Sequence, residues 1–272
     1  MKKAISFVLV FVAMLSFSVI SVGASSSVGV YIDNERFYGS VQVKNNTTYV
    51  GIRAFANAMD EDAVVTYTSY NRTLTIKTDK SLIKCTDGKS YIEVNGRYFY
   101  YEQPNYMKNG VMYAPILNLY RVFGASIKWT DYRGFDVTRG SGYIASGDSF
   151  YRADEVYWLA RIINAESGGE PIKGKIAVGN VILNRVRSSY FPSTIYGVIF
   201  DKKNGTQFSP TINGTIYKAP NEESIIAAKI CLEGYSVNKS ILYFINPYKA
   251  PNSWVAKNRP MFAQIGNHAF YY

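Results

Sequence analysis

Two carboxyl groups, Glu166 and Glu170, lie four positions apart in the segment Glu-Ser-Gly-Gly-Glu-Pro. Apolar residues at helical spacing precede it and predict a helix from Asp154, its N-terminal cap, to about Ala165. Glu166 would then stand at the helix C-terminus, where the helix dipole disfavours negative charge, and Glu170 would add like-charge repulsion. Both effects predict a raised pKa for Glu166, which suits the general acid of glycosidic bond cleavage. The alternative is a solvated carboxylate in a surface loop.

A glycosidase that hydrolyses its substrate needs a second carboxylate at a defined distance from the acid. Glu170 and Asp201 are the two candidates. Glu170 precedes Pro171, which is suited to open a helix, so Glu170 can instead cap that helix by accepting hydrogen bonds from its free N–H groups. Asp201 precedes the polar run Lys202–Gly205 and is expected to lie in a loop.

Three side chains further along the chain are candidates for binding a sugar. Gln207 and Ser209 can form hydrogen bonds with N-acetyl groups, or can instead tie down a turn of their own loop. Tyr243 can stack on a sugar or form a hydrogen bond with it, and packing in the core is an equal alternative.

Three residues nearer the C-terminus complete the candidate site. Asn246 precedes Pro247 and suits a turn, with substrate binding as the alternative. Trp254 lies in a polar segment that predicts a loop, where its ring can serve as a platform for a sugar. His268, the single histidine of the chain, is expected to be structural, or else to orient Glu166 or the substrate. Asn184 and Arg185 are expected to support the site rather than to line it.

The elements that hold these residues are predicted to be mostly helical with short strands. After the helix that ends at about Ala165, a second helix opens at Pro171, and its apolar stripe comprises Ile172, Ile176, Gly179, Leu183 and Val186. A third, short helix follows Pro192, and a fourth covers about 222–233. The β-branched and aromatic run 241–245 predicts a strand.

The N-terminal half contains an internal repeat of about 60 residues. The segment 44–49 aligns with 108–113 at an offset of 64, and the flanking segments align at offsets of 62 and 61. Each copy predicts two strands joined by an Asn/Gly turn, then a short helix near 52–59 or 116–123, then two more strands. The later strands are expected at 64–68 with 73–77, and at 126–130 with 135–138.

Composition narrows the classes of partner. The chain has 272 residues, 30 Lys and Arg against 20 Asp and Glu, one His and two Cys. The net charge of +10 favours an anionic partner such as nucleic acid, a membrane surface or a bacterial wall polymer. One histidine and two cysteines exclude a His-rich metal site and a zinc ribbon, and no cofactor is expected. Cys85 and Cys231 are interpreted as two buried thiols rather than as an inter-domain bridge.

The first residues predict export. A short basic region is followed by an apolar run and by Val22-Gly23-Ala24, which is typical of a signal peptide over 1–24, with an uncleaved membrane anchor as the alternative. Export argues against nucleic acid as partner, and no later stretch of the sequence is long enough to span a bilayer. The sequence favours no particular oligomeric state.

The repeat region resembles the copper amine oxidase N-terminal-like domain, which occurs in secreted proteins of Gram-positive bacteria. The resemblance rests on Tyr113-Ala114-Pro115 before a helix and on Gly124-Ala125-Ser126-Ile127-Lys128-Trp129 after it, with Gly51 where the first copy would have proline. No histidine precedes His268, which argues against an imidazole copper site. This domain is placed at 28–139, with copies at about 28–78 and 90–139, and is interpreted as a wall-targeting or spacer element. A Gly/Ser-rich linker is expected at 140–150.

The C-terminal half, placed at 151–272, resembles over 157–272 the SleB/CwlJ-type cell wall hydrolases, the spore-cortex-lytic enzymes of endospore formers and their relatives. The resemblance rests on six motifs in order: 160–161 with 164–171, then 174–186, 191–195, 207–209, 243–247 and 265–270. It implies a lysozyme-related fold of the mostly helical α+β class, peptidoglycan as the substrate, and one catalytic glutamate that aligns with Glu166. The expected location is the wall or spore envelope of a Gram-positive spore-forming bacterium.

The mechanism implied by this resemblance is lytic transglycosylation of the bond between N-acetylmuramic acid and N-acetylglucosamine. Glu166 would serve first as acid and then as base, and the substrate's own C6 hydroxyl would attack. The alternatives are a muramidase-type hydrolase that uses Glu170 or Asp201, and a non-catalytic wall-binding protein. The sequence does not separate spore cortex from vegetative wall as substrate.

Overall fold

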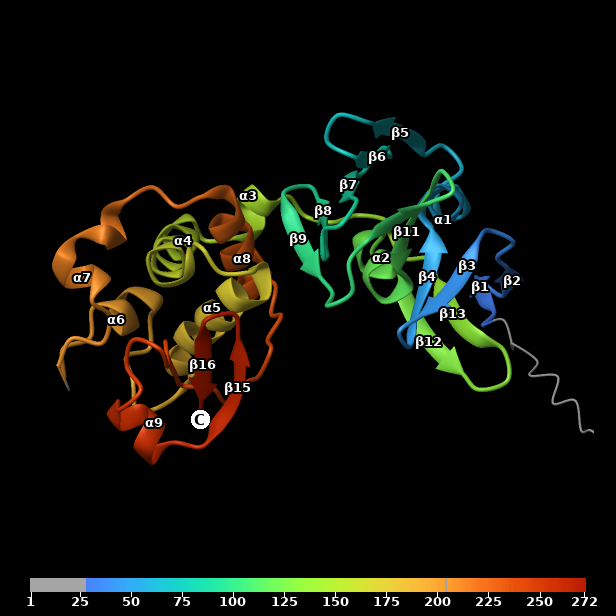
Figure 1. Ribbon diagram of the computed structural model, residues 1–272. Helices are drawn as coiled ribbons and strands as arrows, with labels where there is room; N and C mark the ends of the chain where they lie inside the picture. Colours follow the sequence, from blue (N-terminus) through green and yellow to red (C-terminus); the bar gives the residue numbers. More distant parts are fainter. Residues whose placement is uncertain (1–27, 204) are drawn as a thin grey trace, which may run out of the picture.

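The computed structural model describes residues 28–203 and 205–272, so the predicted signal peptide at 1–24 lies outside the described residues. The chain forms a β-rich N-terminal region and a helical C-terminal region, which lie side by side (Figure 1). Each region has its own cluster of buried apolar side chains. The predicted two-domain arrangement of a β-rich half followed by a mostly helical half is therefore confirmed.

The β-rich region has the same order of elements twice. The first series is β1 (Val30–Ile32), β2 (Glu35–Arg36), β3 (Val41–Lys44), β4 (Thr47–Gly51), α1 (Ile52–Met59), β5 (Val64–Thr68) and β6 (Thr73–Lys77). After β7 (Leu82–Thr86), which the sequence did not predict, comes the second series: β8 (Tyr91–Val94), β9 (Arg97–Tyr100), β10 (Tyr106–Lys108), β11 (Val111–Pro115), α2 (Ile116–Val122), β12 (Ser126–Thr130) and β13 (Gly134–Thr138). The predicted helices and later strands lie where expected, and duplication as their origin stays a prediction.

Three sheets hold these strands, in the orders β12-β13-β1-β2, β10-β11-β4-β3 and β5-β6-β7-β8-β9. Tight turns join the paired strands: Asn45-Asn46 joins β3 to β4, and Asn109-Gly110 joins β10 to β11. All four turn residues have positive φ, which asparagine and glycine tolerate better than other residues. The helices α1 and α2 bury Phe55 and Leu119 in the shared core.

The helical region is built around α5 (Ile172–Arg187), which is buried on all sides from Gly174 to Arg185. It packs against α4 (Ala153–Ser167) and α8 (Glu222–Leu232). At Gly179 a Cβ atom would lie 2.7 Å from Sγ of Cys231, so a glycine lets α5 and α8 approach closely. Cys231 and Cys85 are both buried and free, which confirms the prediction of two thiols.

Shorter elements complete this region. They are α3 (Gly147–Phe150), α6 (Ile195–Ile199), α7 (Pro210–Asn213), the 3₁₀ turn η1 (Thr215–Tyr217), β14 (Tyr243–Ile245), α9 (Trp254–Asn258), β15 (Met261–Ile265) and β16 (His268–Tyr271). The strands form one antiparallel sheet in the order β14-β16-β15. The helices expected after Pro192 and over 222–233 are confirmed as α6 and α8. The hairpin β15–β16 was not predicted.

The structure differs from the sequence-based expectation at the starts of α4 and α9. Arg152, not Asp154, is the N-cap of α4; Asp154 lies in the first turn and forms an ion pair with Arg152 at 2.9 Å. Trp254 begins the short helix α9 rather than lying in a loop, because the hydroxyl of Ser253 caps that helix by accepting from the N–H of Ala256.

The two regions meet where β9 packs against α8 (Figure 1). Arg97 of β9 donates from Nε and Nη2 to the two carboxylate oxygens of Glu233, both at 2.7 Å, and the hydroxyl of Tyr151 donates to the same carboxylate at 2.6 Å. Tyr100 of β9 belongs to the core of the helical region and meets Tyr235 edge-on at 4.5 Å. The two regions are therefore joined by these side-chain contacts as well as by the segment 140–150 of the chain.

Over residues 28–203 and 205–272, we find no helix with the length and apolar character needed to cross a membrane.

Candidate active site

A long open cleft crosses the helical region and gathers all the sequence-predicted site residues. Its walls come from the end of α4, the end of α5, the segment 201–210, β14, α9 and the start of β16. The cleft has a volume of about 1880 Å³, well above the roughly 300–1,000 Å³ of pockets that hold a drug-sized ligand. It can therefore hold several units of a polymer.

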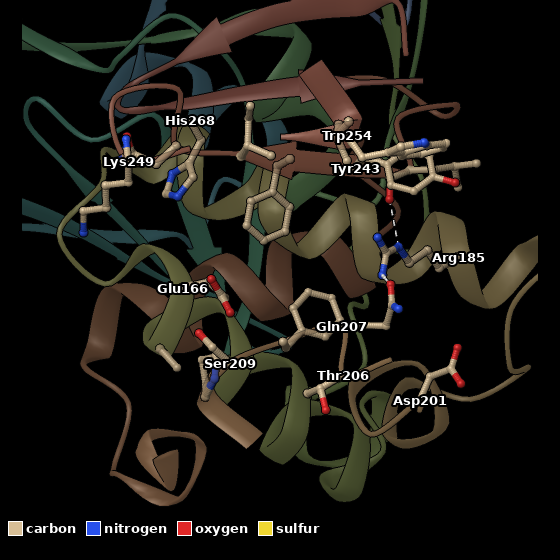
Figure 2. A pocket seen from close by; sticks show the side chains of 18 of the residues that line it. Glu166, Arg185, Asp201, Thr206, Gln207, Ser209, Tyr243, Lys249, Trp254 and His268 are labelled. Atoms are coloured by element: carbon tan, nitrogen blue, oxygen red, sulfur yellow. Dashed lines mark hydrogen bonds between the residues drawn. The ribbon is translucent and has the colours of Figure 1, made fainter. Parts of the chain in front are cut away.

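Glu166 is the penultimate residue of α4 and projects into this cleft (Figure 2). Burial raises the pKa of its carboxyl to about 7, because an apolar environment disfavours the charged form. The predicted direction is confirmed, but the physical cause is burial and not the charge of Glu170. In the described parts of the chain, no hydrogen bond or ion pair holds the Glu166 carboxyl. It is free to meet a ligand.

Glu170 is tied into the structure. Its carboxylate accepts from the backbone N–H of Asn267 at 2.8 Å and from Nδ2 of the same residue at 2.9 Å. Burial opposes ionisation of Glu170, but these two bonds and the nearby His268 and Lys175 outweigh it, so the pKa is lowered. The N-cap of α5 is Pro171, without a side-chain cap. The expectation that Glu170 caps α5 is wrong, since its carboxylate holds the β15–β16 turn instead.

Asp201 lies at the other end of the cleft. Its Oδ1 accepts from the N–H of Lys203 at 2.9 Å, which is the loop arrangement that the sequence predicted. In Figure 2 the side chains of Gln207 and Thr206 lie between Asp201 and Glu166.

Gln207 lies midway along the cleft beside Arg185 of α5. Its Nε2 donates to the carbonyl of Gly205 at 3.1 Å, and its Oε1 accepts from Nη1 of Arg185 at 3.4 Å. Arg185 was expected to support the site without lining it, but it does line the cleft. Asn184 does have the supporting role, since its Nδ2 donates to the carbonyls of Asn238 and Ile241.

Ser209 and Asn246 both line the cleft. Ser209 is exposed in the cleft and precedes α7 without capping it through its side chain. Asn246 accepts at Oδ1 from the N–H groups of Tyr248 and Lys249, at 3.0 and 3.2 Å, so the turn interpretation describes its contacts.

An aromatic and cationic surface forms one end of the cleft. Trp254 is 59% exposed, and the guanidinium of Arg259 lies 5.2 Å from its ring centroid. The same guanidinium lies 4.9 Å from the Tyr243 ring and donates from Nη2 to the Tyr243 hydroxyl at 3.2 Å. Tyr243 therefore lines the cleft and is not packed within the core. Arg259 was not predicted as a site residue, because no periodic pattern or motif marks it.

His268 opens β16 at the end of the cleft nearest Glu166 (Figure 2). It is 7% exposed, meets Phe244 edge-on at 5.4 Å, and burial lowers its pKa. Its Nδ1 lies 3.9 Å from Oε1 of Glu170 and is buried without a hydrogen bond to any described residue. These contacts fit a structural neutral imidazole, and the cleft position also fits contact with a ligand.

Comparison with known proteins identifies two regions of the chain that match known families. Residues 169–271 match the family model described as Cell Wall Hydrolase, and residues 31–134 match the copper amine oxidase N-terminal domain. A spore cortex-lytic enzyme from Bacillus cereus is 38% identical over 120 residues, which are 44% of this chain and 45% of that enzyme. The cell wall hydrolase CwlJ of Oceanobacillus iheyensis is 30% identical over 107 residues, which are 37% of this chain and 74% of that protein.

The chain belongs to the cell wall hydrolase family, and a copper amine oxidase N-terminal-like domain precedes the region that matches this family. Both resemblances inferred from the motifs are confirmed. The solved catalytic domain of the germination-specific lytic transglycosylase SleB from Bacillus anthracis is 36% identical, with a TM-score of 0.41 over 47% of this chain and all of that domain. The chain spans less than half the length of the spore cortex-lytic enzyme that it matches in Bacillus cereus. The family match begins at residue 169, three positions after Glu166.

Proposed function

We propose that this protein cleaves the bond between N-acetylmuramic acid and N-acetylglucosamine in peptidoglycan, as a lytic transglycosylase with Glu166 as its single acid and base. The observation that carries the proposal is a half-buried carboxyl with a pKa of about 7 that stands unbonded in a cleft long enough for a glycan strand. The similarity to spore cortex-lytic enzymes supports peptidoglycan as the substrate.

The reaction follows from the state of Glu166. The protonated carboxyl donates its proton to the glycosidic oxygen, and the bond between that oxygen and C1 of the muramic sugar breaks. The resulting oxocarbenium-like centre is attacked at C1 by the C6 hydroxyl of the same sugar, and the Glu166 carboxylate takes up the hydroxyl proton. The product is a 1,6-anhydromuramic end, and the acid is regenerated without water.

The positions of the other carboxylates favour this route over hydrolysis. Glu170 is occupied by two hydrogen bonds from Asn267 and serves the structure of the β15–β16 turn. Asp201 lies on the far side of Gln207, in a turn of its own loop. Hydrolysis that uses one of these two carboxylates stays the alternative within the same class.

The remaining candidates take supporting roles in this proposal. Gln207, Ser209, Tyr243 and Trp254 would contact the sugars, Asn246 would shape its turn, and His268 would border the sugar nearest Glu166. The basic and apolar sequence of residues 1–24 supports export, and the lysozyme-related fold and the wall-targeting role of the 28–139 domain belong to the same proposal. Residues 140–150 would act as the linker that precedes the 151–272 catalytic domain.

The test is mass spectrometry of fragments released from purified vegetative peptidoglycan and from spore cortex by residues 25–272, with Glu166→Gln as the matched control. Anhydromuramic ends that disappear in the Glu166→Gln variant are expected. Reducing ends, heavier by one water, would indicate hydrolysis and direct attention to Glu170 and Asp201. Binding without release of fragments from either substrate would favour a non-catalytic wall-binding protein.

A further inference from the structure

Arg185 brings a buried positive charge to the floor of the cleft. It lies in the last turn of α5 and is only 5% exposed. Its Nε donates to the carbonyl of Leu242 at 2.8 Å, and its Nη1 donates to Oε1 of Gln207 at 3.4 Å. A guanidinium has five N–H donors, so these two bonds leave donors for a ligand. Figure 2 shows Arg185 beyond Gln207 as seen from Glu166.

The surroundings of Arg185 keep water away from this charge. The guanidinium lies 4.8, 5.3 and 5.4 Å from the ring centroids of Phe191, Phe208 and Tyr243. Burial lowers the pKa of Arg185 to about 10, so the side chain is still positively charged at neutral pH. A desolvated charge is costly unless an opposite charge compensates it.

No described carboxylate forms an ion pair with Arg185, and the charge of Asp201 acts on it only from a longer distance, where it raises the pKa of Arg185 without offsetting the effect of burial. Of the carboxylates in residues 28–203 and 205–272, none lies within 4 Å of the Arg185 guanidinium. Asp201 is an acidic residue at this end of the cleft, and its Oδ1 accepts a hydrogen bond from the N–H of Lys203. Arg259, stacked near Trp254 and Tyr243, adds a second guanidinium to the same end. This end of the cleft is therefore prepared for an anion.

We propose that Arg185 binds a carboxylate that the substrate carries on the 3-O-lactyl group of a muramic acid residue, either the lactyl carboxylate itself or one in the peptide attached to it. Guanidinium pairs with carboxylates through parallel, charge-assisted hydrogen bonds, which are the strong ones in a dry site. The inference rests on the proposed function and makes it more specific. The enzyme would favour strands that bear acidic substituents at this subsite over strands with a neutral lactam or with N-acetylglucosamine alone.

The test is a binding cycle in the uncleaving Glu166→Gln background, which separates recognition from catalysis. Calorimetry would give Kd for peptide-free glycan strands with free lactyl carboxylates, for peptide-bearing strands, and for the methyl-esterified form of each. We expect esterification to weaken binding to the Glu166→Gln protein by about 10- to 100-fold and to leave binding to Glu166→Gln/Arg185→Met unchanged. The strand type that shows this dependence identifies which carboxylate is bound.

Two further variants test whether the effect of esterification is specific to Arg185. Arg259→Met removes the exposed cation at the same end and should keep the difference between free and esterified strands. Arg185→Lys keeps the charge and should retain part of that difference, which provides a measurement if Arg185→Met does not fold. Esterification that affects the Arg185→Met and parent proteins equally, or affects neither, would overturn the proposal.

Failure of this inference is distinguishable from failure of the proposed function. Wild-type protein that cleaves free and esterified strands at the same rate would leave glycan cleavage standing and overturn the role of Arg185. Binding that depends on esterification and on Arg185, without any cleavage, would support the carboxylate site and overturn the catalytic proposal.

Discussion

Glu170 and Asn267 are 97 residues apart in the chain, and two hydrogen bonds of 2.8 and 2.9 Å join them across the base of the cleft. One comes from the backbone and one from the side chain, so the carboxylate fixes both the position and the orientation of the β15–β16 turn. His268 follows that turn directly. The loop after Glu166 and the strand that carries His268 are therefore held in one geometry by a carboxylate that does not itself need to react.

Replacing this carboxylate should reduce stability in a pH-dependent way. Because the pKa of Glu170 is lowered in the folded protein, its contribution is present above the unfolded pKa and is lost as pH falls through the folded value. We expect Glu170→Gln to lose about 2 kcal/mol of unfolding free energy at pH 7, and less in acid. Urea titrations at several pH values measure this, and a pH-independent loss would contradict it.

The contact between Glu170 and Asn267 also requires a glycine at position 266. The φ of Gly266 is +61°, and a Cβ atom there would lie only 2.0 Å from Oε2 of Glu170. We expect Gly266→Ala to displace the Glu170 carboxylate and to destabilise the protein well beyond the roughly 1–2 kcal/mol of left-handed backbone strain. Gly214→Ala is the matched control, since Gly214 has φ +78° with nothing within 4 Å. Equal thermal shifts in the two variants would argue against the steric contact.

The pKa of Glu166 predicts the alkaline limb of activity. A general acid works only when protonated, so kcat/KM on isolated peptidoglycan should fall as pH rises through about 7, by about tenfold per pH unit. A turbidity assay between pH 5 and pH 9 gives this profile. A rate that stays level to pH 9 would show that the protonated form of Glu166 is not required.

The same burial predicts that Glu166 reduces stability. The pKa of Glu166 rises from 4.5 to about 7 on folding. The folded protein therefore loses stability as pH increases through that interval, because the unfolded chain ionises more easily. Glu166→Gln should therefore be more stable than wild type at pH 8, by an amount on the order of 3 kcal/mol. At pH 4 the two proteins should unfold at similar urea concentrations. A variant of equal or lower stability at pH 8 would mean that the carboxyl is well solvated.

The ion pair between the regions predicts a strong coupling. Arg97→Met leaves the buried Glu233 carboxylate without its cation and should cost about 3–5 kcal/mol, while Arg97→Met/Glu233→Leu should recover much of that loss. Unfolding free energies of the single and double variants give the coupling. Hydrogen exchange along α8 should rise most in Arg97→Met. Simple additivity of the two substitutions would indicate independent sites.

Local patterns predicted most of the elements. The helices α1, α2, α5 and α8 and the later strands of each repeat follow from apolar periodicity and turn residues, which act over a few positions. The strand β7 and the hairpin β15–β16 were missed. The residues of β16 show no alternation, since this strand is buried on both faces, as the exposures of the neighbouring Ala269 and Phe270 show.

The candidate site was predicted in part for the same reason. Glu166 was located from its helix and its motif, but burial as the cause of its raised pKa comes from packing that no short segment contains. The partner of Glu170 lies 97 positions away, and Arg259 meets Tyr243 from the end of α9. Arg185 lies in a helix that is buried on all sides, so its sequence position gave no sign that it reaches the cleft.

The contact of Glu233 with Arg97 and Tyr151 bears on how such a protein can be reassembled from modules. The helical domain carries the Glu233 carboxylate at the end of α8, and among the described residues its ion-pair partner is Arg97 of β9, which lies outside the family match at 169–271. Grafting that domain onto a different N-terminal domain would leave the Glu233 carboxylate without its ion-pair partner. A successful chimera must therefore transfer β9 together with α8, or exchange both members of the pair at once.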